Sequence, residues 1–238
     1  MNQILVSEKV YVTPELKRKR KTYKIVFLLC LILVIILSFY YVFAEYEKGQ
    51  KEQISREILD EMDNTTVEEN VVVVSLDDTD EVEEVPIIEM PTTTTVTNSI
   101  NSEVTANGQQ YKTEAILNYA KLGINYPVLA EENEELLKVS LCKYWGPNPN
   151  KVGNYCIVGH NYKSGKMFGK LSRAQIGDEI SLTDLSGKEV KYSVYNTYVV
   201  EPTDVSCTSQ LTNGAREITL ITCTNYGQQR FIVKAKEI

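Results

Sequence analysis

One cysteine, one arginine and the only histidine of the chain stand at the ends of strand-like runs. Cys223 ends the run "EITLITC", Arg230 begins "RFIVKAKE", and His160 follows "NYCIVG". A cysteine acts as a nucleophile in its thiolate form, and a neighbouring imidazolium or guanidinium favours that form. If the fold brings these three side chains together, they form a set sufficient for acyl transfer.

The spacing between Cys223 and Arg230 predicts that they are neighbours. Six residues, "TNYGQQ", separate them, and Gly227 suits a turn. In an antiparallel hairpin the end of one strand lies beside the start of the next, so both residues would lie on one rim. A cation at that rim would also stabilise the oxyanion of acyl transfer. The structural alternative is a buried cysteine, a hydrogen-bonded histidine and a solvated arginine, in a domain that only binds.

Strand signals dominate the region that must position these residues. The strand-like runs are rich in β-branched and aromatic residues, and they cover 124–130, 154–159, 178–183, 188–200, 217–223 and 230–237. Residues 113–122 fit a helix or a strand, and residues 131–137 predict a short helix. Many short strands with few helices favour a β-barrel or a β-sandwich.

The N-terminal part of the chain predicts a membrane anchor. Residues 25–44 form an uncharged run of 20 residues, "IVFLLCLILVIILSFYYVFA", which as a helix spans about 30 Å. The basic stretch "KRKRKTYK" precedes it, so residues 1–24 are predicted to be a cytoplasmic tail and everything after the run to lie outside. A cleaved signal peptide is the alternative, but the length of the run favours an anchor.

Residues 45–110 are acidic, with seventeen Asp and Glu against three Lys and Arg. Such a segment buries too little apolar surface to fold alone, and it predicts an extended linker. Ile54, Ile58 and Met62 have helical spacing, for which we expect a solvated helix without a partner. Residues 111–238 are nearly neutral and form the predicted folded domain. They lack the clustered basic face of a nucleic-acid-binding protein, so no nucleic-acid partner is expected.

The remaining cysteines do not predict a metal site. Cys30 lies in the apolar run, and Cys142, Cys156 and Cys207 lie in the folded domain without CxxC or Cys/His spacing. We expect these three to be ordinary thiols. A disulfide between two of them is the alternative, since they would lie outside the membrane.

Several segments resemble the sortase family. The stretch "TLITC" (219–223), followed by Arg230, resembles the TLxTC…R signature of sortases, and "GNYCIVGHNYKSGKMFGKL" (153–171) resembles the segment with the sortase histidine. "LGINYPV" and "IGDEISLTD" also fit, so the resemblance covers nearly all of the folded domain. It implies an all-β fold, a closed eight-stranded β-barrel with a few short helices, and it favours a strand for 113–122.

The resemblance also implies an activity and a site. The chain would be a single-pass, membrane-anchored cysteine transpeptidase of a Gram-positive bacterium. Cys223 would be the nucleophile and His160 the general acid. Arg230 would bind substrate backbone and stabilise the oxyanion, and Thr222 would help line the oxyanion site. The resemblance implies no organic cofactor.

The implied substrates are surface proteins that carry a C-terminal sorting signal of the LPxTG kind. The enzyme would cut after the threonine, hold the protein as a thioester, and pass it to a cell-wall peptide amine on a lipid-linked precursor or on peptidoglycan. Two alternatives remain from the residues themselves. One is a cysteine hydrolase whose acyl-enzyme reacts with water, and the other is a membrane-tethered binding module.

Overall fold

A computed structural model describes residues 14–64 and 102–238. The chain divides into two compact units, and the boundary along the sequence lies between Gly49 and Gln50. The first unit contains most of the long helix α1 (Pro14–Asn64), and the second contains the last turns of α1 together with every strand that the structure describes.

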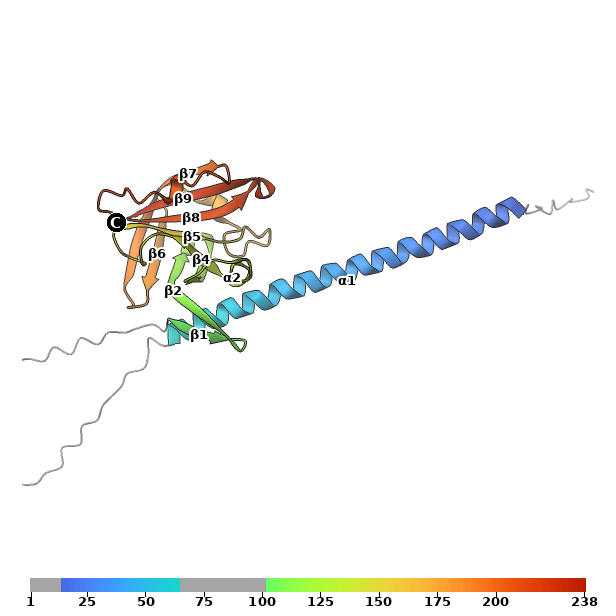
Figure 1. The fold of residues 1–238 in the computed structure, drawn as a ribbon, viewed down its shortest axis with the longest axis horizontal. Coiled ribbons are helices and arrows are strands. Elements are labelled where there is room, and N and C mark those ends of the chain that lie inside the picture. The colour runs from blue at the N-terminus through green and yellow to red at the C-terminus, as the bar shows by residue number, and fades with distance from the viewer. Residues whose placement is uncertain (1–13, 65–101) are drawn as a thin grey trace, which may run out of the picture. The chain divides into compact units, whose positions relative to one another are not determined.

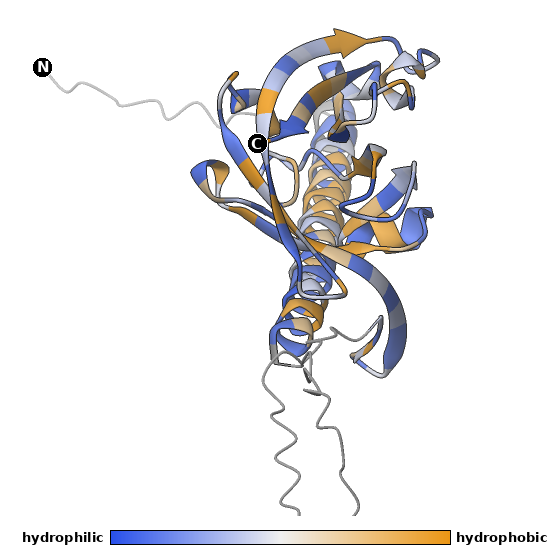
Figure 2. Ribbon diagram, turned by 90° about the vertical axis from the view of Figure 1, so that its left-hand side faces the viewer, coloured by the Kyte–Doolittle hydropathy of each residue, from blue (hydrophilic) through white to orange (hydrophobic). Residues whose placement is uncertain are grey.

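Within the first unit, α1 contains the apolar run found in the sequence. It is the one helix in the described ranges that is long and apolar enough to cross a membrane. Residues 25–43 are all exposed, so the apolar side chains of the run pack against none of the residues that the structure describes. Figure 2 shows this part of the helix mainly in the hydrophobic colour. A continuous apolar surface of this length suits the hydrocarbon core of a bilayer.

In the second unit, the last turns of α1 pack against the folded domain. Ile54, Ile58 and Met62 are buried, and they belong to a cluster with residues of β1 (Glu103–Ala106), β2 (Gln109–Tyr119), β3 (Ile124–Leu129), α2 (Glu134–Val139) and β4 (Leu141–Trp145). The prediction of a solvated helix without a partner is therefore wrong. Their four-residue spacing places them on one helix face, and that face finds an apolar partner in the domain. Residues 65–101 of the predicted linker lie outside the described residues. Glu103–Ala106 of that linker form β1 and Gln109 begins β2, so the folded domain starts before the predicted residue 111.

The second unit is built on a closed barrel of eight strands, preceded by the short strand β1 (Glu103–Ala106). The barrel strands are β2 (Gln109–Tyr119), β3 (Ile124–Leu129), β4 (Leu141–Trp145), β5 (Gly153–Val158), β6 (Glu179–Asp184), β7 (Glu189–Val200), β8 (Arg216–Thr224) and β9 (Gln229–Glu237). Their order is β2-β3-β4-β5-β8-β9-β7-β6, and pairing of β6 with β2 closes the barrel (Figure 1). The predicted barrel is confirmed.

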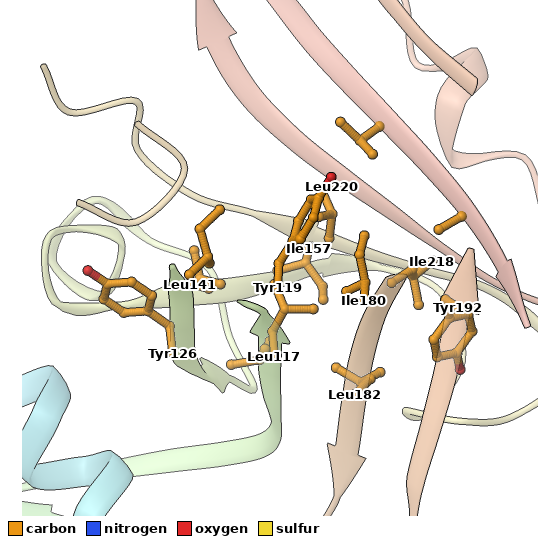
Figure 3. Close-up of a cluster of buried hydrophobic side chains, with 14 of the residues drawn as sticks. Leu117, Tyr119, Tyr126, Leu141, Ile157, Ile180, Leu182, Tyr192, Ile218 and Leu220 are labelled. Atoms are coloured by element: carbon orange, nitrogen blue, oxygen red, sulfur yellow. The ribbon is translucent and has the colours of Figure 1, made fainter. Parts of the chain in front are cut away.

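Alternate residues of the barrel strands fill its interior. Figure 3 shows part of this cluster, with leucine, isoleucine and tyrosine side chains from seven strands, β2 to β8, packed together. The buried tyrosines keep their hydroxyl groups hydrogen-bonded: Tyr155 donates to Glu114, Tyr192 to Asn150, and Tyr119 to Asp178. Burial of apolar surface is the main source of stability, and partnered hydroxyls avoid the cost of buried unpaired polar groups.

The predicted elements are largely present. Each of the six predicted strands is found, and 113–122 is mostly the strand β2 followed by a 3-10 turn (Ala120–Leu122). The short helix predicted at 131–137 is α2 (Glu134–Val139), whose first turn is capped by the Asn133 side chain. Strands β1 and β4 were not predicted, since neither shows a long β-branched run.

Candidate active site

Three neighbouring strands bring the candidate residues to one edge of the barrel (Figure 1). β5 and β8 are parallel, with Val158 opposite Ile221, and the Gly159 amide donates to the Ile221 carbonyl oxygen at 3.2 Å. This register continues toward His160 and Cys223. β8 and β9 are antiparallel, and Cys223 lies directly opposite Arg230. The predicted hairpin between these two residues is confirmed.

A pocket of about 250 Å³ opens at this edge, and His160, Cys223 and Arg230 all line it. Strand alternation explains this, because residues two positions earlier or later on each strand share the face. The corresponding neighbours are apolar and line the same pocket: Val158, Ile221 and Ile232. The pocket therefore combines an apolar base with three groups capable of acyl-transfer chemistry.

One wall of the pocket comes from the connection between β7 and β8. Pro202, Asp204, Val205, Cys207 and Thr208 contribute to the lining. The buried side chain of Asn154 on β5 holds this connection, because its amide nitrogen donates to the carbonyl oxygens of Cys207 at 2.9 Å and of Ser209 at 3.1 Å. The wall is thus fixed to the strand that leads to His160.

Cys223 is half-buried, and its backbone is held by a side chain of the segment after β5. Its carbonyl oxygen accepts a hydrogen bond of 2.8 Å from the side chain of Asn161. Thr222, one residue earlier, points to the opposite face. Its hydroxyl is buried and donates to the Gly159 carbonyl oxygen at 2.7 Å, and Thr222 is not among the residues that line the pocket. The Thr222 side chain is therefore directed away from the pocket, and the place of Thr222 at the oxyanion site, which the resemblance implies, stays a prediction.

His160 is half-buried beside the pocket, and its ring centroid lies 5.2 Å from that of Tyr162. Burial, and to a lesser degree the positive charge of Lys138, holds the pKa of His160 below its ordinary value. Both causes disfavour the imidazolium, because a charged ring loses hydration on burial and is repelled by a like charge.

Arg230 is half-buried, and its guanidinium is steadied by local backbone. Its Nη1 donates to the carbonyl oxygens of Gly227 at 3.0 Å and of Gln229 at 3.2 Å. Gly227 belongs to the turn between β8 and β9, and Gln229 is the first residue of β9. The planar fork of arginine carries further donors, which suit a carbonyl or carboxylate oxygen of a ligand.

The three other cysteines of the folded domain are buried thiols. All five cysteines are free, so the alternative of a disulfide is not realised. Burial raises the pKa of Cys142 and Cys156 to about 12, and it also raises the pKa of Cys207. Such thiols are poor nucleophiles. Within the described ranges no group of three or more His, Cys, Asp or Glu side chains is arranged to hold a metal ion.

Sequence reasoning missed two parts of the site. Asn161 binds the backbone of Cys223, and its position directly after His160 was the available signal. The wall at 202–208 has no motif of its own, and it reaches the pocket only because the connection between β7 and β8 folds back over β5.

Comparison with known proteins decides the family. The sortase domain family model matches residues 117–238, which is half of the chain and includes His160, Cys223 and Arg230. The chain belongs to the sortase family. It is therefore a transpeptidase of the sortase type. No curated protein matches this sortase in sequence.

Solved structures of other sortases are similar to this one. A sortase D5 transpeptidase from Clostridium perfringens is 26% identical, with a TM-score of 0.49 over 53% of this chain and 79% of that chain. Sortase A from Corynebacterium diphtheriae is 24% identical, with a TM-score of 0.50 over 54% of this chain and 61% of that chain. Sortase C-1 from Actinomyces oris is 24% identical, with a TM-score of 0.48 over 52% of this chain and 73% of that chain.

Proposed function

We propose that this sortase joins surface proteins to a cell-wall peptide amine, with Cys223 as the nucleophile. The observation that supports this most strongly is the register of the three strands. It places Cys223 opposite Arg230 and directs β5 and His160 to the same pocket. Cys142, Cys156 and Cys207 are buried, which leaves Cys223 as the half-buried cysteine of the pocket.

In the first half of the reaction, the sulfur of Cys223 attacks the threonine carbonyl carbon of the sorting signal. The tetrahedral oxyanion collapses, and the bond from that carbon to the following amide nitrogen breaks. His160 gives its proton to the leaving amine, and the protein remains bound as a thioester. In the second half, the acceptor amine attacks the thioester, its proton passes to His160, and the Cys223 thiolate is released.

Arg230 has the chemistry for two roles in this scheme. Its guanidinium is always charged and lies opposite the nucleophile, so it stabilises the oxyanion more strongly than the ground-state carbonyl. It also donates hydrogen bonds to substrate backbone. The bonds from Nη1 to the carbonyl oxygens of Gly227 and Gln229 hold the guanidinium in place before substrate arrives.

We infer that the sorting signal is of the LPxTG kind and that α1 anchors the enzyme in the cell membrane. The apolar base of the pocket suits the leucine and proline of such a signal. The basic residues before the apolar run favour a cytoplasmic N-terminus and an extracellular barrel. Cysteine labelling or protease treatment of intact cells tests this orientation, because only an outward barrel is accessible.

Mass measurement on the full chain in detergent tests the reaction. We expect incubation with an LPxTG-like peptide to add the mass of the acyl fragment to Cys223, and hydroxylamine to remove it as a thioester. Addition of candidate amines should then yield the peptide joined to the amine. If hydrolysed peptide is the main product with every amine, the enzyme is a hydrolase. If Cys223 gains no acyl group from any sorting peptide, the proposed mechanism is wrong.

A further inference from the structure

Tyr126 on β3 connects the last turns of α1 with the segment that follows His160. The Tyr126 hydroxyl donates to the carboxylate oxygens of Glu52 at 3.0 and 3.2 Å, and it accepts the backbone N–H of Met167 at 3.1 Å. Since an amide N–H only donates, the hydroxyl proton is directed to Glu52. In Figure 3 this hydroxyl points away from the other labelled core side chains.

Met167 is a position that needs such support. Its φ is +48°, in the left-handed region that residues other than glycine rarely adopt. Its side chain is buried in the barrel core, and its backbone forms an isolated bridge with Asn161. A residue in this conformation persists where its surroundings fix it, and the Tyr126 hydroxyl binds the very amide of the strained residue.

The segment from His160 to Phe168 closes on the candidate active site. The Phe168 amide donates to the His160 carbonyl oxygen at 3.0 Å, so the two ends of the segment are joined. Asn161 pairs with Met167 and also donates to the carbonyl oxygen of Cys223. A continuous set of contacts therefore leads from Glu52 through Tyr126 and Met167 to the residues beside both His160 and Cys223.

The Glu52–Tyr126 pair is well shielded from water. Tyr126 is 6% exposed, and the Glu52 side chain is 11% exposed and also pairs with Arg56 at 3.1 Å. Burial, with a smaller contribution from Glu52, raises the pKa of Tyr126 to about 12, so the hydroxyl keeps its proton and remains a donor. Hydrogen bonds in such sites are stronger than in water, and a lost partner is costly.

We propose that Glu52 and Tyr126 are positioning residues that hold the segment 160–168, and with it His160, in the geometry of the reaction. The proposal rests on the proposed role of His160. The helix that follows the apolar run is then a working part of the catalytic domain, because its Glu52 supports the site from outside the barrel.

The test compares Tyr126→Phe with Tyr111→Phe in the full chain in detergent. Tyr111 is a matched control, because it is also buried beside the end of α1, but its hydroxyl donates to Gln109 on its own strand. We expect Tyr126→Phe to lower kcat about tenfold, the effect of one lost buried hydrogen bond, with little change in KM for the sorting peptide. Backbone hydrogen exchange of residues 160–168 should become faster. Tyr111→Phe should change neither quantity.

Variants of Glu52 provide the second arm, which matters if Tyr126→Phe folds poorly. Glu52→Ala should reproduce the kcat and exchange changes, and Glu52→Gln should restore them largely, since an amide oxygen still accepts the hydroxyl proton. Hydrogen exchange decides the inference even if no sorting peptide is turned over, so its outcome is separate from that of the proposed function. Unchanged exchange of 160–168 in both Tyr126→Phe and Glu52→Ala would overturn the proposal.

Discussion

The Thr222 hydroxyl donates a hydrogen bond of 2.7 Å to the carbonyl oxygen of Gly159, and this bond joins the residue before Cys223 to the residue before His160. Both residues are buried, so the bond is shielded from water. It ties the ends of two strands that carry the two reacting side chains. We therefore expect Thr222 to act on the distance between these side chains rather than on the substrate.

Thr222→Val tests this bond, because valine has the same shape but no donor. We expect the free energy of unfolding to fall by about 1–3 kcal/mol, the cost of a buried unpaired carbonyl, and kcat to fall with little change in KM. Thr222→Ser should recover most of both losses. Chemical denaturation and peptide turnover measure these quantities, and a fully active Thr222→Val enzyme would contradict the expectation.

Substitutions of the opposed residues Cys223 and Arg230 distinguish the role of the nucleophile from that of the group that stabilises the oxyanion. Cys223→Ala should abolish thioester formation while thermal unfolding stays close to that of the wild type. Arg230→Ala should lower kcat/KM by about 10²–10³-fold, as for loss of an oxyanion donor. Arg230→Lys keeps the charge but not the planar fork, so its activity should remain well below that of the wild type. Equal activity of Arg230→Lys and the wild type would show that charge alone suffices.

The single histidine makes the titration of His160 directly measurable by NMR of the imidazole. We expect a pKa below the ordinary value for histidine, and a partial return toward it in Lys138→Gln, because burial is the larger cause and remains. Lys163→Gln is the control, since this exposed lysine is not a cause of the shift.

The direction of this shift also sets a pH dependence of stability. A folded-state pKa below the unfolded value means that the unfolded chain binds the proton more readily. The contribution of His160 to stability is therefore present above its ordinary pKa, and it is lost as pH falls through the folded-state pKa. Lys138→Gln should reduce this acid loss, and unfolding measured across that pH range would show an unchanged loss if the assignment is wrong.

Asn154 is expected to control substrate affinity through the wall of the pocket. Asn154→Ala removes both bonds to the connection between β7 and β8 and leaves the buried Thr219 hydroxyl without its 2.7 Å acceptor. We expect a loss of about 2–3 kcal/mol in the free energy of unfolding and a higher KM for the sorting peptide. Asn125→Ala, at an exposed position of β3, should leave KM unchanged.

Ile58 tests whether the end of α1 belongs to the folded domain. Its side chain is 0% exposed in the cluster with the β1–β2 hairpin and α2. Ile58→Ala should lower the free energy of unfolding by about 2–5 kcal/mol, the range for removal of a large buried aliphatic side chain. Gln53→Ala on the exposed side of the same helix should have almost no effect. If both variants are equally stable, the end of α1 does not unfold cooperatively with the domain.

Local patterns predicted what depends on neighbouring residues along the chain. Strand alternation predicted which side chains share a face, and the six-residue connection predicted that Cys223 and Arg230 are opposed. The barrel followed from the resemblance, because alternation alone does not distinguish a barrel from a sandwich.

What the sequence did not reveal depends on partners far apart in the chain. The helical spacing of Ile54, Ile58 and Met62 shows an apolar face but not the surface that covers it. Likewise, the roles of Asn154 and Tyr126 arise only because the β7–β8 connection and the segment after His160 fold back over these strands. For Thr222, alternation places its side chain on the face opposite that of Cys223, and its place at the oxyanion site, implied by the resemblance alone, stays a prediction.

The strands that carry the site have hydrogen-bonded neighbours on both sides. β5 lies between β4 and β8, β8 lies between β5 and β9, and β9 lies between β8 and β7. A peptide therefore has no open strand edge to extend at the pocket, and β-augmentation is not available as a way to bind. Recognition of the sorting signal must come from side chains and from the β7–β8 connection, which makes specificity adjustable by changes in that connection without alteration of the barrel.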